Sequence, residues 1–138
     1  MLEELVCSER VRADLLRATA AAAPRECAAV LGGSRGPGRA SITQLVEVPN
    51  VGRGEDAFAI DPVDFARAER AITRRGLTFL GFAHSHPRGA AAPSLRDLKE
   101  LWTGCFHLIA GASQVRAFWL DRSRVPHAVA LTAQEARS

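Results

Sequence analysis

Residues 84–97 read HSHPRGAAAPSLRD, and this stretch guides the interpretation of the whole chain. It directly follows Leu77–Ala83, an apolar run that is typical of a strand buried on both faces. Side chains of an extended chain alternate between its two faces, so His84 and His86 project to the same side. The stretch therefore predicts two imidazoles that converge on one point at the end of a buried strand.

Ser94 and Asp97 lie three residues apart at the start of a predicted short helix that runs through Leu101. Side chains at this spacing occupy adjacent rows of one helix face. If the strand end points at the helix start, two imidazoles and one carboxylate meet. Three nitrogen and oxygen ligands with an open fourth position are typical of a catalytic zinc site, where a coordinated water has its pKa lowered towards about 7.

Each half of this stretch also has a purely structural interpretation. Two histidines at a strand end can simply be hydrogen-bonded polar residues. Ser94 and Asp97 match a capping box, in which the serine caps the helix and the aspartate accepts a hydrogen bond from a free backbone N–H. We favour a metal site because both halves occur together in one motif. A closed structural zinc site would need mostly cysteine ligands, and the cysteines do not cluster with the histidines: they are Cys7, Cys27 and Cys105.

The sequence on both sides predicts helices that alternate with strands. Ser8 begins a helix that ends at Pro24, and Asp61 with Pro62 begins another that ends at Gly76. This pattern predicts an α/β fold with a mixed central β-sheet flanked by helices. The predicted strands are Glu26–Gly33, Ala40–Val48, a brief segment around Phe58 and Ile60, Leu77–Ala83, Cys105–Ala110, Val115–Leu120 and Val125–Leu131.

The composition limits the class of protein. With 138 residues, 47% of them hydrophobic and 24% charged, the chain suits a single globular domain over residues 1–138 that needs no disulfide framework. The apolar stretches are far too short to span a bilayer, and the first twenty residues carry too many charges for a secretory signal. We therefore expect no membrane segment and, given three sparse cysteines, a cytoplasmic location. A net charge of +3 from scattered arginines, with 6% aromatic residues, argues against nucleic-acid binding.

The complete spacing resembles that of a known family. The pattern of residues 84–97, His-Ser-His, seven residues, Ser, two residues and Asp, resembles the JAMM signature of the MPN-positive zinc metalloproteases, including Pro87 and Pro93. The resemblance extends to residues 24–33, PRECAAVLGG, where the family places a glutamate at the start of the first strand after the N-terminal helix. Element order and length are similar to those of a compact prokaryotic member. The resemblance implies the MPN/JAMM fold, with a cytidine-deaminase-like architecture.

The resemblance also implies a role for five residues. His84, His86 and Asp97 would bind Zn²⁺. Glu26 would accept a proton from the attacking water as general base and return it to the leaving amine. Ser94 would donate a hydrogen bond to the oxyanion of the tetrahedral intermediate, while zinc polarises the scissile carbonyl. Only the family position selects Glu26 among the glutamates of the chain.

The substrates that the resemblance implies are ubiquitin-like β-grasp proteins with Gly-Gly tails. Small bacterial proteins of this kind process sulfur-carrier proteins, from which they remove a C-terminal extension or a cysteine. We therefore expect a zinc metallopeptidase that hydrolyses peptide or isopeptide bonds at such tails. Residues Pro49–Asp56 are polar, contain two glycines and are expected to be mobile. The overlapping segment Asn50–Phe58 is the candidate flap over an extended tail. This flap and the arginine-rich helix that begins at Asp61 would also allow a homodimer.

Two other function classes compete with this interpretation. A non-catalytic MPN-type interaction module usually lacks one or more metal ligands, whereas every ligand is present here. A zinc nucleoside deaminase shares the general architecture but needs Pro-Cys-x-x-Cys, and this chain contains no C-x-x-C. We interpret His107 and His127 as core or surface residues, Cys27 as a packing residue that faces away from Glu26, and residues 33–38 as a hairpin loop.

Overall fold

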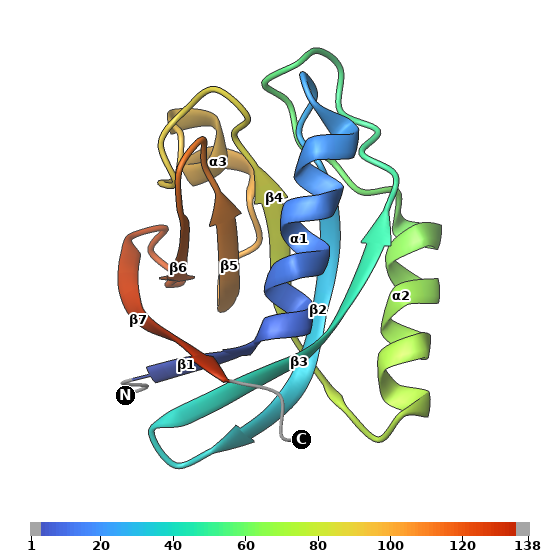
Figure 1. Ribbon diagram of the computed structural model, residues 1–138, viewed down its shortest axis with the longest axis vertical. Coiled ribbons are helices and arrows are strands. Elements are labelled where there is room, and N and C mark those ends of the chain that lie inside the picture. The colour runs from blue at the N-terminus through green and yellow to red at the C-terminus, as the bar shows by residue number, and fades with distance from the viewer. Residues whose placement is uncertain (1–3, 135–138) are drawn as a thin grey trace.

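Two long strands form an antiparallel hairpin at the centre of the computed structural model, which describes residues 4–134 (Figure 1). They are β2 (Ala28–Gly36) and β3 (Arg39–Val48). β2 continues three residues past its predicted end at Gly33, so the predicted loop is a short turn through Pro37 and Gly38. Gly38 has a φ of 68°, a conformation that glycine adopts without strain.

The sheet contains parallel and antiparallel pairs, as predicted, but it closes into a barrel rather than forming a layer between helices. The strand order is β1-β3-β2-β4-β5-β6-β7, and β1 is parallel to both β3 and β7. Closure depends on β1, which the sequence pattern did not predict. The remaining strands are β1 (Glu4–Ser8), β4 (Thr78–Ser85), β5 (Cys105–Ala110), β6 (Val115–Leu120) and β7 (Pro126–Gln134).

The three predicted helices are confirmed: α1 (Glu9–Ala22), α2 (Pro62–Arg74) and α3 (Leu95–Glu100). Ser8 caps α1, since its Oγ accepts a hydrogen bond from the Val11 N–H at 3.2 Å. None of the helices within residues 4–134 is long and apolar enough to cross a membrane.

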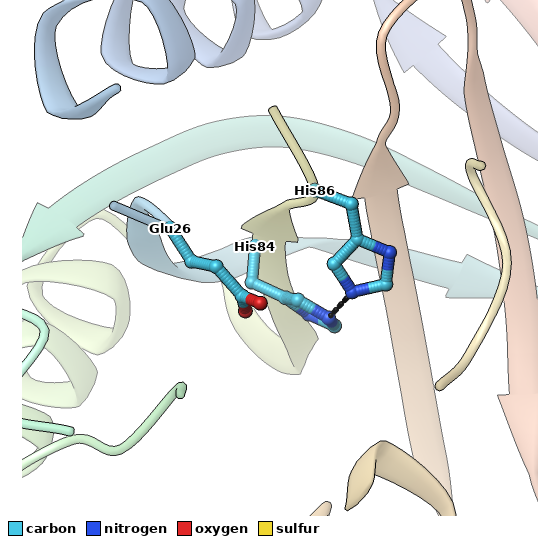
Figure 2. A group of neighbouring side chains, drawn as sticks. All are labelled: Glu26, His84 and His86. Atoms are coloured by element: carbon cyan, nitrogen blue, oxygen red, sulfur yellow. Dashed lines mark hydrogen bonds between the residues drawn. The ribbon is translucent and has the colours of Figure 1, made fainter. Parts of the chain in front are cut away.

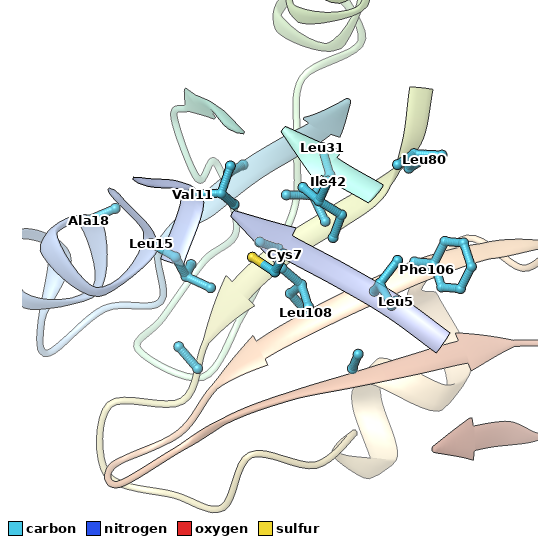
Figure 3. Packing of buried hydrophobic residues seen from close by; sticks show 14 of the residues in the cluster. Leu5, Cys7, Val11, Leu15, Ala18, Leu31, Ile42, Leu80, Phe106 and Leu108 are labelled. Carbon is cyan, nitrogen blue, oxygen red and sulfur yellow. The ribbon is translucent and has the colours of Figure 1, made fainter. Parts of the chain in front are cut away.

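Alternating side chains of β2 divide the core into two clusters. Ala29 and Leu31 pack with the α1 side chains, among them Leu15, in the cluster that Figure 3 shows. Ala28 and Val30 point the other way and pack with α2. Because strand side chains alternate between faces, α1 and α2 lie on opposite faces of β2. β4 contacts both helices, and its last two residues are His84 and Ser85.

The brief strand predicted around Phe58 and Ile60 is wrong, since the segment between β3 and α2 contains no strand among the described residues. Phe58 instead stacks on His84, with ring centroids 4.8 Å apart and an interplanar angle of 26°. Ile60 packs against the cluster beneath α2. The apolar character of the segment therefore reflects burial without strand pairing.

Gly81 is a position where the fold has no room for a side chain, and its φ of 156° is one that other residues rarely adopt. It pairs with Phe106 across β4 and β5, and an added Cβ would lie 1.9 Å from the Phe106 carbonyl oxygen. We expect Gly81→Ala to lower the free energy of unfolding by at least about 3 kcal/mol, because two backbones would have to separate. At Gly36 the nearest atom to a Cβ is 4.0 Å away, so Gly36→Ala should change stability by less than about 0.5 kcal/mol. Urea denaturation of both variants tests this, and equal losses would contradict it.

Candidate active site

The pairing of β2 with β4 brings Glu26 next to the histidine motif. Ala28 of β2 lies opposite His84 of β4 in this antiparallel pair, so the residues just before β2 lie beside the residues at the end of β4. Ser85 fixes this junction, since its buried Oγ accepts a hydrogen bond from the Cys27 N–H at 2.8 Å. The Glu26 carboxyl group then points toward the imidazoles of His84 and His86 (Figure 2).

Asp97 caps its own helix and contacts both histidines with the same oxygen. The Ser94 N–H donates to Asp97 Oδ2 and the Asp97 N–H donates to Ser94 Oγ, each at 3.0 Å, so the predicted capping box is present. Asp97 Oδ2 also lies 3.1 Å from Nε2 of His84 and 3.1 Å from Nε2 of His86. The structural and the functional interpretation of this motif are therefore compatible, because one carboxylate oxygen serves both.

The donor atoms of His84, His86 and Asp97 fit a tetrahedral zinc ion. The two Nε2 atoms are 3.1 Å apart, which makes an equilateral triangle with Asp97 Oδ2. Ligands with bonds of 2.0–2.1 Å in a tetrahedral zinc site are separated by about 3.3 Å. Glu26 is a less suitable third ligand, because its carboxylate oxygen and the two histidine nitrogens form a wider group, with separations of up to 4.8 Å.

Glu26 is buried beside this triangle with a free acceptor. Its side chain is 5% exposed, and its Oε1 has no hydrogen-bond partner within residues 4–134. Burial raises the pKa of Glu26 to about 7, with the charge of Asp97 adding to the increase and that of His86 opposing it. A carboxyl group with this pKa can both accept and release a proton near neutral pH.

Asp97 and His86 stabilise each other's charged forms. Burial alone would raise the pKa of Asp97, but hydrogen bonds with His84 and His86 outweigh it and hold this pKa far below its ordinary range. The hydrogen bond with Asp97 raises the pKa of His86 to about 8, against the effect of burial. In the metal-free protein the aspartate is therefore ionised and ready to bind a cation.

A cleft of about 990 Å³ opens over these residues. Glu26, His86 and Ser94 line it, together with residues 53–56, 87–90 and 92–96. A separate, mainly apolar pocket of about 370 Å³ is lined by Phe58, Phe65 and Trp102 among others. The candidate site therefore has access to solvent and room for an extended chain.

Comparison with known proteins now identifies the family. The family described as prokaryotic homologs of the JAB domain matches residues 8–121. The chain belongs to this family. A Thermus thermophilus protein named as a probable TtuB-protein conjugate cleaving protease is 37% identical over 117 residues, which cover 84% of this chain and 73% of that protein.

Solved structures share the JAB fold of the chain. The solution structure of a Desulfitobacterium hafniense protein matches with a TM-score of 0.87 at 20% identity, over 96% of this chain and 94% of the other. The crystal structure of a JAB1/MPN domain protein from Archaeoglobus fulgidus matches with a TM-score of 0.59 at 21% identity, over 98% of both chains. The expected MPN/JAMM fold is therefore confirmed.

The residues interpreted as structural lie outside the His84–His86–Asp97 triangle. His127 forms an exposed pair with Asp121, with 2.8 Å between Nε2 and Oδ2. His107 is buried on β5, where its Nε2 lies 2.8 Å from the Trp102 carbonyl oxygen. Cys27 packs in the core beside Thr19, with 3.7 Å between its Sγ and the threonine Oγ1. All three therefore lie outside the triangle, as predicted, but the buried Nδ1 of His107 has no hydrogen-bond partner within residues 4–134.

Sequence reasoning missed Asn50, which fixes the loop before α2. Its Nδ2 donates to the carbonyl oxygens of Glu26 at 2.9 Å and Ala57 at 2.8 Å. Its Oδ1 accepts from the N–H groups of Gly52 at 2.9 Å and Ala59 at 3.0 Å. The loop that was expected to be mobile is therefore anchored at both ends and attached to the backbone of Glu26. An asparagine at the start of a glycine-containing loop is the sequence signal for such a turn.

Asn50→Ala should release this loop without unfolding the barrel. The variant loses four hydrogen bonds, and we expect a local loss of roughly 2 kcal/mol, equivalent to about 30-fold faster exchange of the Gly52 and Ala59 amide hydrogens. Hydrogen–deuterium exchange read by mass spectrometry or NMR measures this change. The amide of Leu108, in the middle of β5, is the internal control. Unchanged exchange at Gly52 and Ala59 would show that the loop is held by other contacts.

Proposed function

We propose that this protein is a zinc-dependent peptidase that hydrolyses peptide or isopeptide bonds at the C-terminal tails of ubiquitin-like or sulfur-carrier proteins. The observation that carries this proposal is the triangle of His84, His86 and Asp97, with 3.1 Å between each pair of donor atoms. Glu26 and the Ser94 hydroxyl lie on the cleft beside it. This combination supplies metal ligands, a base and a hydrogen-bond donor, which amide hydrolysis without a covalent intermediate requires.

His84, His86 and Asp97 would hold the zinc ion. Three protein ligands leave a fourth position open, as in catalytic rather than structural zinc sites. When bound, zinc polarises the scissile carbonyl and makes hydroxide available at neutral pH. Asp97 contributes the negative charge of the ligand set, and its second role as a helix cap fixes its orientation.

Glu26 would transfer the proton. Its Oε1 is free to accept a proton from the attacking water, and the cleft gives the substrate access to the same carboxyl group. The leaving amine then needs a proton, which the protonated carboxyl group donates. A pKa raised to about 7 by burial suits both halves of this cycle.

Ser94 would stabilise the oxyanion that forms at the scissile carbonyl. Its Oγ accepts a hydrogen bond from the Asp97 N–H at 3.0 Å, and this contact leaves the hydroxyl proton available for donation. The residue is exposed on the cleft, so a substrate carbonyl can reach it. A donor that the capping box already orients loses little freedom when the oxyanion forms.

The relative from Thermus thermophilus supports the substrate class, since its name assigns it to TtuB-protein conjugates. The cleft of about 990 Å³ has room for an extended Gly-Gly tail. Residues 53–56 line this cleft, so the segment Asn50–Phe58 is the proposed flap over the tail. The anchored Asn50 makes this flap a preformed wall.

The test uses the full chain and a purified β-grasp sulfur carrier in two forms, one with a C-terminal peptide extension and one linked to a lysine side chain. We expect mass spectrometry to detect the mature carrier after incubation with the zinc-loaded protein. Prior treatment with 1,10-phenanthroline should abolish the product, and added zinc should restore it. The non-chelating isomer 1,7-phenanthroline is the matched control.

Two results would overturn the proposed function. Cleavage that continues in fully zinc-depleted protein would exclude the proposed metal dependence. A zinc-loaded protein that binds the carrier and leaves both forms intact would favour the non-catalytic interaction module.

A further inference from the structure

Two buried imidazole nitrogens on neighbouring strands have no hydrogen-bond partner in the described part of the chain. They are Nδ1 of His84 on β4 and Nδ1 of His107 on β5. His84 is 0% exposed and His107 is 1% exposed, so neither ring reaches bulk solvent. Buried polar atoms are normally satisfied, and the proposed reaction gives no partner to either nitrogen.

The two nitrogens are complementary. In the proposed zinc-loaded protein, Nε2 of His84 binds the metal and must be proton-free, so the neutral ring carries its proton on Nδ1 and can donate. Nε2 of His107 lies 2.8 Å from the Trp102 carbonyl oxygen, which can only accept. The His107 proton is therefore on Nε2, and its Nδ1 is an acceptor. Burial lowers the pKa of His107 to about 4, which keeps this ring neutral.

The register of β4 and β5 places both rings on one face. His84 lies opposite Ile109, and Phe82 lies opposite His107 in this parallel pair. Residues two apart on a strand share a face, so His84 and His107 are diagonal neighbours on one face of the sheet. Phe82 stacks on His107, with centroids 5.9 Å apart and an interplanar angle of 20°, and so orients that ring.

We propose that His107 is a positioning residue for His84. The Nδ1–H of His84 donates to one buried water, and this water donates to Nδ1 of His107, whose Nε2–H holds the Trp102 carbonyl oxygen. Polar groups beyond direct hydrogen-bond distance are commonly bridged in this way. The inference rests on the proposed role of His84 as a zinc ligand.

The other histidine of the site shows the same principle with a direct contact. Nδ1 of His86 lies 3.0 Å from the Ala90 carbonyl oxygen. A ligating histidine nearly always donates its second N–H to such a partner, which fixes its tautomer and ring orientation. His107 provides the corresponding support for His84. Without His107, the proton of His84 would no longer be held on Nδ1, and Nε2 would no longer be kept free to bind zinc.

Glutamine and asparagine separate the two nitrogens of His107. His107→Gln places an amide nitrogen near the position of Nε2, so it retains the donor to Trp102 and loses the acceptor toward His84. His107→Asn retains an acceptor near Nδ1 and loses the donor to Trp102. We expect the zinc Kd of the glutamine variant to rise about 10–100-fold. The zinc Kd of the asparagine variant should stay within about 3-fold of the wild-type value. In the absence of metal, the Tm of the asparagine variant should be lower than that of the glutamine variant.

Competition with a chromogenic chelator measures the zinc Kd, and the visible absorption spectrum of the Co²⁺-loaded protein reports the orientation of the ligands. If His107 only supports the fold, the less stable variant will also bind zinc more weakly. The asparagine variant would then have a higher zinc Kd than the glutamine variant. That ranking, or a wild-type Kd for the glutamine variant, would overturn the proposal. A wild-type protein that binds no zinc would overturn the zinc site itself, and the first titration would show it.

Discussion

Glu26→Gln should retain its zinc and lose between about 10² and 10⁴-fold of kcat on an extended carrier substrate. Glutamine preserves the size of the buried side chain but cannot accept a proton. Glu26 is also not part of the triangle with 3.1 Å edges, so the three proposed metal ligands remain. Single-turnover kinetics and the zinc content of the purified variant measure the two effects separately.

The pH profile gives an independent view of the same residue. Burial raises the pKa of Glu26 to about 7, so the fraction of ionised base grows as the pH rises through this value. We expect kcat/KM to fall about tenfold per pH unit on the acidic side. A bound zinc ion favours the carboxylate, so the midpoint of the loaded protein lies at or below 7. This acidic limb should be absent from the residual activity of Glu26→Gln.

Glu47→Gln is the matched control for these measurements, because Glu47 is an exposed residue of β3 outside the cleft. Its kcat should stay within about twofold of the wild-type value. Wild-type kcat in Glu26→Gln would assign the proton transfer to another group. If the wild-type protein and Glu26→Gln bind the carrier equally well and neither hydrolyses it, the protein is an interaction module.

The arrangement of the proposed ligands could be predicted from sequence because its geometry is local. His84 and His86 share a face through the twofold repeat of a strand, and Ser94 and Asp97 share the first turn of a helix. The capping box then fixes where the carboxylate points. The directions of these four side chains therefore follow from the local structure of residues 84–97.

Barrel closure could not be predicted, because it depends on strands from opposite ends of the chain. β1 pairs in parallel with β7, and Cys7 lies opposite Ala133. Leu5, Val6 and Cys7 are all buried, so β1 lacks the alternation of polar and apolar residues that identifies a strand. Its five residues therefore look like an apolar lead into a helix.

The neighbours of the site depend on strand register, which is also non-local. Glu26 reaches the histidines because Ala28 pairs with His84, and nothing in the sequence around Glu26 specifies that partner. The loop around Asn50 was expected to be mobile from its glycines. Its anchoring results from the four hydrogen bonds of one side chain. Local composition reports polarity, but only the fold shows which polar atoms meet.

Asp97→Asn should weaken zinc binding on the order of 10²–10³-fold, and hydrolysis should disappear with the metal. The free energy of zinc binding to structural sites with four protein ligands is about 10–16 kcal/mol, so each ligand contributes roughly 3 kcal/mol. Asparagine still accepts a hydrogen bond from the Ser94 N–H, so α3 should remain capped. The loss would thus come from the missing carboxylate charge rather than from a disordered helix. Isothermal titration with zinc and the far-UV circular dichroism of the variant measure both points.

The metal-free protein offers a second measurement on the same variant. The hydrogen bond with Asp97 raises the pKa of His86 to about 8, so NMR titration of the wild-type imidazole should have its midpoint near that value. In Asp97→Asn the midpoint should fall, because burial alone favours the neutral ring. Ser94→Ala is the matched control for zinc binding: it loses the Oγ half of the capping box but keeps all three proposed ligands and the Ser94 N–H that donates to Asp97 Oδ2, so its zinc Kd should stay near the wild-type value. Its kcat should fall about 10²–10³-fold through loss of the oxyanion donor. Wild-type zinc affinity in Asp97→Asn would instead assign the third ligand position to Glu26, the other carboxylate within 4.8 Å of both histidines.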